Sequence, residues 1–159
     1  PPSHPVAATP QHPLHTLLIA QPMIPARCPS GMPSMSLSQI GSAAERLAAA
    51  FLELKGYRIL ETNYRYLRKE IDLVAAVGRK IVFVEVKCRT SEAFGTPAES
   101  VDLRKRRRIA LAARGYLTEK RCGNASCRFD LVEVRVRRGG LSLLIEHIPG
   151  AFGADGGRW

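Results

Sequence analysis

Apolar residues recur at steps of three and four along residues 39–55, which is the spacing of one face of an α-helix. The residues on this stripe are Ile40, Ala44, Leu47, Phe51 and Leu54. Ser38 or Ser42 can cap the start of the helix, and Gly56 follows its end at a position that favours a left-handed backbone. The pattern therefore predicts a helix over 39–55 that buries one face.

Three runs of β-forming residues follow this helix. Residues 57–65 predict a first strand, and residues 71–77 and 80–87 predict two more, separated only by Gly78-Arg79. A Gly-X pair between two such runs is typical of a type II′ turn, so these two strands are predicted to form a hairpin. Both faces of the hairpin are largely apolar, as expected for central strands of a buried sheet.

The rest of the body repeats the order of a helix followed by strands. Residues 97–117 predict a helix with Pro97 near its first turn, and residues 128–136 and 141–147 predict two strands. Gly139-Gly140 predicts the turn between these strands. The order indicates an α/β fold in which helices flank a central mixed β-sheet of about five strands.

Charged residues gather at one end of the predicted hairpin. A two-residue turn at 78–79 places Asp72 opposite Glu85 and Glu70 opposite Lys87, all on one side of the sheet. This quartet interrupts an otherwise apolar ribbon. It is the strongest candidate for a functional site in the chain.

The quartet has a chemical interpretation and a structural one. Opposed carboxylates repel each other, and a divalent cation between Asp72 and Glu85 would remove that cost. Oxygen ligands favour Mg²⁺, or Mn²⁺, over zinc. Lys87 could orient an attacking water or stabilise charge on a phosphate, as phosphodiester hydrolysis requires. The alternative is a solvated cross-strand salt-bridge ladder, which the apolar neighbours on both faces disfavour.

These motifs resemble the PD-(D/E)xK signature of restriction-endonuclease-like nucleases. The match is closer to the YraN-like family of bacterial predicted endonucleases, which is similar in fold to archaeal Holliday-junction resolvases. It covers residues 39–152 and includes Gly41, Glu45, Gly56-Tyr57, Ile59-Leu60, Asn63, Arg65, Glu70-Ile71-Asp72, Phe83-Val84-Glu85-Val86-Lys87, Arg89, Lys105, Arg128-Phe129-Asp130 and Ala151-Phe152. Lys69 stands where the family usually has glycine, and Ile71 where the PD motif has proline.

The resemblance assigns roles residue by residue. It implies that Asp72 and Glu85 are metal ligands, that Lys87 is the catalytic lysine, and that Glu45 helps to bind the metal or water. The residue pattern alone favours an exposed helix position for Glu45. Lys105 shares the apolar face of the second helix, so it is either a second cation at the site or a side chain whose ammonium reaches out of the core.

The positive charge is unevenly distributed. The chain has a formal net charge of +10, but residues 1–38 hold nine of its eleven prolines and only one charged side chain, Arg27. We expect 1–38 to be a disordered and dispensable tail from an over-extended start, 39–152 to be the nuclease-like domain, and 153–159 to be a flexible terminus. The scattered cysteines indicate a reducing compartment, and we expect a cytoplasmic protein without a membrane partner.

Basic residues near the quartet predict a nucleic-acid partner. The candidates for phosphate-backbone contacts are Arg68, Lys69, Arg89, Arg104, Lys105, Arg106, Arg107 and Arg108. The run at 104–108 could instead be a solvated helix face. We expect structure-selective binding of DNA, with branched or junction DNA as the guess by analogy, and a homodimer is one expected assembly. The leading interpretation is a Mg²⁺-dependent nuclease; the alternative is a catalytically inactive nucleic-acid-binding module.

Overall fold

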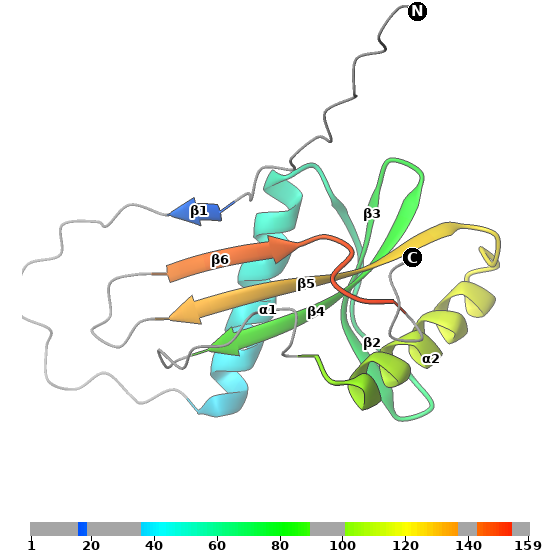
Figure 1. Ribbon diagram of the computed structural model, residues 1–159, viewed down its shortest axis with the longest axis horizontal. Coiled ribbons are helices and arrows are strands. Elements are labelled where there is room, and N and C mark those ends of the chain that lie inside the picture. Colours follow the sequence, from blue (N-terminus) through cyan, green and yellow to red (C-terminus); the bar gives the residue numbers. More distant parts are fainter. Residues whose placement is uncertain (1–15, 19–35, 90–100, 137–142, 154–159) are drawn as a thin grey trace, which may run out of the picture.

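A six-stranded mixed sheet lies between two helices in the computed structural model (Figure 1). The structure describes residues 16–18, 36–89, 101–136 and 143–153. The elements are β1 (Thr16–Leu18), α1 (Leu37–Leu54), β2 (Arg58–Tyr66), β3 (Lys69–Val77), β4 (Lys80–Arg89), α2 (Leu103–Glu119), β5 (Ser126–Val136) and β6 (Leu143–Ile148). The strand order is β1-β6-β5-β4-β3-β2, and only the β4–β5 pair is parallel.

The predicted α/β architecture is confirmed, with two changes at its edges. The body has the expected order of one helix, three strands, a second helix and two strands. The sheet of about five strands gains a sixth, β1, which pairs with β6 and comes from the segment that we expected to be a tail. The Gly139-Gly140 turn and Pro97 lie outside the described residues.

Helix α1 begins earlier than predicted, because its cap is Ser36. The Ser36 hydroxyl accepts from the Gln39 backbone N–H while the Gln39 side chain accepts from the Ser36 N–H, a complete capping box. The buried stripe is also shifted from the predicted one: Leu47 is 39% exposed and Leu54 is 82% exposed. The residues that face the sheet are Ala44, Ala48, Phe51 and Leu52. Their steps of four, three and one still describe one helical face.

Helix α2 begins at Leu103, later than the predicted start at 97. Asp102 has an extended backbone and its side chain accepts from the Lys105 N–H, so it is the N-cap. Gly115 lies where the helix meets β2, and a Cβ there would collide with the ring of Tyr66. The helix links the parallel strands β4 and β5, as a crossover connection must.

The hairpin register is confirmed near the turn but ends before the charged residues. The antiparallel partners run from Val77 and Lys80 to Leu73 and Val84, and Gly78 has a φ of 56°. Beyond these pairs β3 stays with β2, and β4 stays with β5. The expected facing pairs, Asp72 with Glu85 and Glu70 with Lys87, are therefore not part of the β3–β4 ladder. The two strands part at the level of Asp72.

A bend in β2 and β3 accompanies this separation. Asn63 has a φ of 53°, the left-handed region that asparagine tolerates better than most residues. The surrounding β2–β3 pairs, Thr62 with Leu73 and Tyr64 with Ile71, put Asn63 at the level of Asp72. Leu73 packs in the cluster with α1, whereas Ile71 packs in the cluster with α2, although both have the same strand parity. The sheet therefore changes its facing at Asp72.

The core has one apolar cluster on each face of the sheet. One cluster packs the buried side of α1 against Leu73, Val82 and Val84. The other packs α2 against Val74 and Phe83 of the central strands. Glu85 shares strand parity with Phe83, so it lies on the α2 face, where Lys105 of α2 reaches it. No helix among the described residues is long and apolar enough to cross a membrane.

Candidate active site

Asp72 occupies the point where β3 and β4 part. Its Oδ2 atom accepts a hydrogen bond of 2.7 Å from the backbone N–H of Val86. The backbone ladder between β3 and β4 ends at Leu73 and Val84. Beyond it, the Asp72 carboxylate replaces a backbone carbonyl of β3 as the acceptor for a β4 N–H. The same contact ties Asp72 to the strand that carries Glu85 and Lys87. The sequence prediction that these residues come together is correct, although a side chain rather than the ladder joins the strands there.

Glu85 is the buried acid of the site. Its side chain is only 3% exposed, and its Oε1 atom lies 3.1 Å from Lys105 Nζ and 3.6 Å from Lys87 Nζ. Its Oε2 atom is buried and has no hydrogen-bond partner among the described residues. An unpaired buried carboxylate oxygen is costly, so it indicates a position that a ligand completes.

The two acids influence each other. Burial, the largest cause, and the negative charge of Glu85 raise the pKa of Asp72 from 3.8 to about 7. Glu45 on α1 also raises this pKa, which places its charge within range of the site. The Val86 N–H and Lys105 act in the opposite direction. Desolvation of Asp72 and its proximity to Glu85 therefore outweigh the favourable contacts that the protein supplies to this carboxylate.

These donors fit a hard divalent cation. The available atoms are carboxylate oxygens, which Mg²⁺ prefers, and one of them, Glu85 Oε2, has no partner within the described part of the chain. No group of three His, Cys, Asp or Glu side chains in the described ranges is close enough to form a ready metal cluster. The three acids Glu45, Asp72 and Glu85 thus do not form a complete cage. Mg²⁺ commonly binds to one or two carboxylates and completes its shell with water and phosphate oxygens.

Glu70 does not join the site. Its carboxylate forms an ion pair with Arg65 of β2, with 3.3 Å between Arg65 Nη2 and Glu70 Oε1. Both side chains are well exposed. The predicted quartet is therefore wrong in this member, because β3 pairs with β2 at this level and presents Glu70 to that strand. Lys105, rather than Glu70, is the fourth charged residue of the site, together with Asp72, Glu85 and Lys87.

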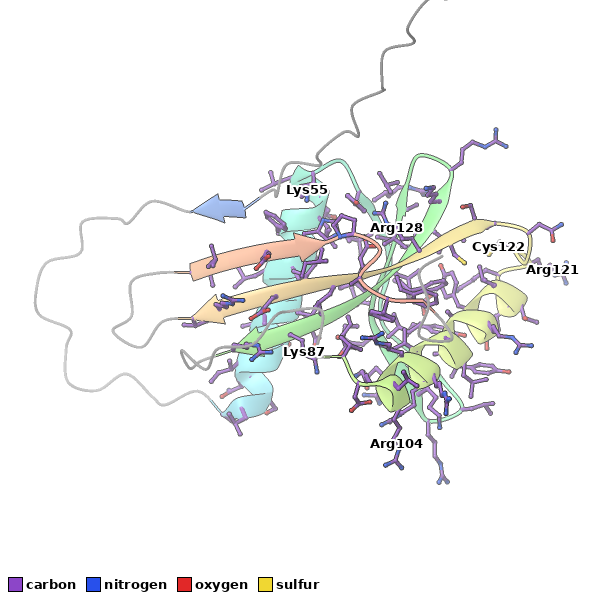
Figure 2. All side chains as sticks on the ribbon, viewed as in Figure 1. Lys55, Lys87, Arg104, Arg121, Cys122 and Arg128 are labelled. Atoms are coloured by element: carbon purple, nitrogen blue, oxygen red, sulfur yellow. The ribbon has the colours of Figure 1, made fainter. Side chains whose placement is uncertain are left out.

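The five consecutive cations of α2 point in different directions. Lys105 reaches Glu85, and the Arg106 guanidinium donates to the Val101 carbonyl and lies over the Phe152 ring. Arg104, Arg107 and Arg108 are exposed. Figure 2 shows Arg104 at the start of α2, pointing away from the sheet. The run is thus partly site, partly packing and partly open basic surface.

The other predicted phosphate contacts lie at two places on the sheet. Arg68 is exposed in the β2–β3 turn and Lys69, half-buried, begins β3. Arg89 ends β4 and forms an ion pair with Glu133 of β5. The turn residues Leu67 and Arg68 both have positive φ angles, 45° and 60°, so this turn is held in a conformation that glycine or asparagine would adopt more easily.

Glu133 and Arg135 lie beside the site, and the sequence did not indicate them. The parallel register places Lys87 opposite Glu133 and Arg89 opposite Arg135. Residues 128–136 alternate without a purely polar face, so their pattern gives no signal for a buried acid at 133. Only the pairing of β4 with β5, which are separated by a helix, brings these residues together.

A third buried acid, Asp130, lies on the opposite face of the sheet. It belongs to the matched motif Arg128-Phe129-Asp130, but the motif alone indicated no role for it. Its four hydrogen-bond distances are 2.7 Å to Arg128 Nε, 2.9 Å to Arg128 Nη2, 2.9 Å to His147 Nε2 and 2.9 Å to the Gly150 N–H. Lys55 Nζ lies 2.8 Å from His147 Nδ1. Figure 2 shows Lys55 and Arg128 well away from Lys87. Burial alone would raise the pKa of Asp130, but the hydrogen bonds from His147 and Arg128 outweigh it and hold that pKa below its usual value.

Known proteins share this sequence over most of the body. The model of "Uncharacterised protein family UPF0102" matches residues 44–134. A UPF0102 protein of Moorella thermoacetica is 49% identical over 119 residues, which are 75% of this chain and 99% of the relative. Another, from Caldanaerobacter subterraneus, is 41% identical over 122 residues, which are 76% of this chain and all of the relative.

One solved structure shows a limited likeness. Pyrococcus furiosus SfsA, solved in complex with Ca²⁺, is 17% identical with a TM-score of 0.37, and the match covers 68% of this chain and 62% of that chain. The chain belongs to the uncharacterised family UPF0102, which is the YraN-like family that the sequence motifs predicted.

Proposed function

We propose that the protein is a metal-dependent, endonuclease-like phosphodiesterase that acts on DNA and selects its substrate by structure rather than by base sequence. The observation that carries this proposal is the pair of acids at the parting of β3 and β4. Asp72 has a pKa raised to about 7, and Glu85 has a buried oxygen for which the described residues offer no partner. Two under-compensated acids beside two lysines are costly to fold, and binding a substrate and a cation would offset that cost.

Each residue has a distinct proposed task. Asp72 and Glu85 would hold Mg²⁺ or Mn²⁺, and Glu45 would approach it from α1. Such an ion, when bound, supplies neutralising charge and a more acidic water. Lys87, whose ammonium is held near Glu85 Oε1, stabilises the charge that develops on the phosphate. Lys105 adds a second ammonium on the side of α2.

Basic residues around these groups would hold the phosphate backbone. Arg104, Arg107 and Arg108 project from α2, which packs against the same face of the sheet as the site. Contacts with the phosphate backbone contribute affinity that does not depend on base sequence, which supports structure-selective binding. A DNA substrate would place the protein in the cytoplasm.

The test is cleavage of labelled linear, flapped and four-way DNA by the full chain, with and without Mg²⁺ or Mn²⁺. Asp72→Asn and Lys87→Ala should each lower the rate by about 10² or more, the usual cost of losing a charge-stabilising group. Lys80→Ala is the matched control for Lys87→Ala, because Lys80 begins the same strand at its far, exposed end. Cleavage that survives both site substitutions would show that the site is wrongly assigned.

A non-catalytic binding module is the second candidate, and one observation favours it. Lys87 and Lys105 both pair with Glu85, so the protein's own cations already compensate part of the buried charge. Tight DNA binding without cleavage under any divalent cation would favour the module. Retention of Asp72, Glu85 and Lys87 together makes the enzyme the better supported of the two.

A further inference from the structure

Three charged residues form a compact group next to the proposed active site. Arg89 at the end of β4 faces Arg135 on β5, and two pairs earlier Lys87 faces Glu133. Strand alternation puts all four side chains on the face that carries Glu85. Two residues of strand separate Arg89 from Lys87, which is about 7 Å along β4. The group therefore lies next to the site on the same face of the sheet, toward the ends of β4 and β5.

Glu133 compensates the repulsion between the two arginines. Like charges directly opposed across two strands are destabilising. Glu133 Oε1 lies 3.1 Å from Arg89 Nε and 2.6 Å from Arg135 Nε. The second oxygen of this carboxylate, Oε2, is buried without a hydrogen-bond partner in the described part of the chain. One acid between two arginines leaves the group with a net charge of +1.

The acid lies underneath and the arginines lie at the surface. The Glu133 side chain is fully buried, whereas the side chains of Arg89 and Arg135 are 28% and 37% exposed. Both arginines meet Glu133 through Nε, the nitrogen nearest the chain. Arg135 Nη2 also approaches Glu146 of β6, at 3.8 Å. The remaining edges of the planar guanidinium groups suit a phosphate, which arginine binds through two parallel hydrogen bonds.

We propose that Arg89 and Arg135, held in place by Glu133, form a phosphate-binding subsite for the nucleic-acid backbone beside Lys87. Successive nucleotides of a duplex strand advance about 3.4 Å along the axis, so this subsite would hold a phosphate one to two nucleotides from the one at Lys87. Glu133 is a positioning residue: it fixes both guanidinium groups and does not touch the substrate. The subsite rests on the proposed function for its place beside the reacting phosphate, but its affinity for DNA does not require cleavage.

Binding in the presence of EDTA tests the subsite separately from the chemistry. Fluorescence anisotropy with labelled linear duplex and four-way DNA gives the dissociation constant of the full chain at several salt concentrations. Arg135→Gln ends at the nitrogen position that meets Glu133, so it keeps a donor there but removes the charge. It should weaken binding about three- to tenfold and reduce the magnitude of the log–log salt slope by about one. Arg79→Gln removes the same charge at the opposite end of β4, in the exposed turn before it, and should leave the slope unchanged.

The two proposals can fail independently. Equal salt slopes for Arg135→Gln and Arg79→Gln would overturn the subsite, and the triad would then be a structural ion-pair group only. A reduced slope together with no cleavage by the wild type would support the subsite and count against the nuclease. If Arg135→Gln is unfolded by circular dichroism, Arg89→Gln, which removes the other half of the pair, carries the same expected slope change and the same overturning outcome.

Discussion

Two aspartates of one sheet, the buried Asp130 and the partly buried Asp72, have very different surroundings. Asp130 accepts four hydrogen bonds from three residues, and its pKa is held below its usual value. Within the described ranges Asp72 accepts one hydrogen bond, from the Val86 N–H, and its pKa is raised to about 7 beside Glu85. Both are aspartates on strands of the same sheet, so residue type and secondary structure do not separate them. The difference lies in whether the protein itself supplies the compensating donors.

A satisfied acid indicates a structural role and an under-compensated acid indicates a site. The donors around Asp130 come from β5, β6 and the segment after β6, so the carboxylate joins several parts of the chain. The donors that Asp72 and Glu85 lack are those that a cation and a substrate would bring. This comparison makes predictions with opposite signs for the same substitution at the two positions.

Asp130→Asn should be the most damaging change to stability. An amide would put an N–H group against one of the donors from Arg128, His147 or Gly150, and it would leave the partly buried Arg128 charge without its partner. Breaking a buried pair of this kind costs about 3–5 kcal/mol of unfolding free energy. Urea denaturation followed by circular dichroism measures the loss.

The pH dependence of the Asp130 contribution has a defined sign. Because the folded pKa lies below the unfolded value of 3.8, the carboxylate stabilises the protein above that value and loses this contribution as the pH falls through the folded pKa. Glu53→Gln, on the exposed side of α1, is the control and should stay near the wild type. A loss of unfolding free energy below about 1 kcal/mol for Asp130→Asn would contradict the structural role of Asp130.

Asp72→Asn should instead stabilise the metal-free protein near pH 8. The folded pKa of about 7 lies above the unfolded value of 3.8, so the folded state binds the proton more tightly. Stability from this group is therefore fully present below pH 4 and is lost as the pH rises through 7. Removing the charge should raise the unfolding free energy at pH 8 by about 1–3 kcal/mol, since each pKa unit corresponds to about 1.4 kcal/mol.

Thermal unfolding of both proteins at pH 4 and pH 8 in EDTA measures this effect. The melting temperatures should differ at pH 8 and come close together at pH 4. Excess Mg²⁺ should stabilise the wild type more than Asp72→Asn, because a ligand that binds only the folded state stabilises it. A destabilised Asp72→Asn at pH 8 would mean that Asp72, like Asp130, is a structural acid.

Local patterns in the sequence were sufficient for part of this comparison. The hairpin register follows from a two-residue turn, and helical periodicity correctly turned Lys105 inward, where it reaches Glu85. Asp72, Glu85 and Lys87 lie on strands that touch along the chain, so their meeting could be predicted. The assignment of Lys105 to the site rather than to solvent needed only the position of α2 on the same face.

Non-local pairing explains what the sequence did not reveal. Glu133 reaches Lys87 only because β5 returns parallel to β4 after a helix, and Asp130 is satisfied by β6 and Gly150. The parting of β3 and β4 coincides with the left-handed Asn63 across from Asp72. The sequence pattern of a strand does not indicate that an asparagine within it has a left-handed backbone. The β3–β4 pairing predicted from the sequence therefore extended too far and placed Glu70 in the site, although it faces Arg65.

Lys105→Met should give the smallest of these effects, and it tests how the site is compensated before a cation binds. The Lys105 ammonium lies 3.1 Å from Glu85 Oε1. Its positive charge would repel a divalent cation bound to the same carboxylate. Methionine keeps the apolar length of the side chain but removes the competing charge. The affinity for Mn²⁺ or Mg²⁺, measured by calorimetry on the DNA-free chain, should rise about three- to tenfold, which is about 1 kcal/mol. Arg104→Met, the exposed neighbour on the same helix, should leave the affinity unchanged and controls for net charge. If the affinity falls in Lys105→Met, Lys105 positions Glu85 for the cation instead of competing with it. Glu85 would then depend on a donor from the protein itself, as Asp130 does.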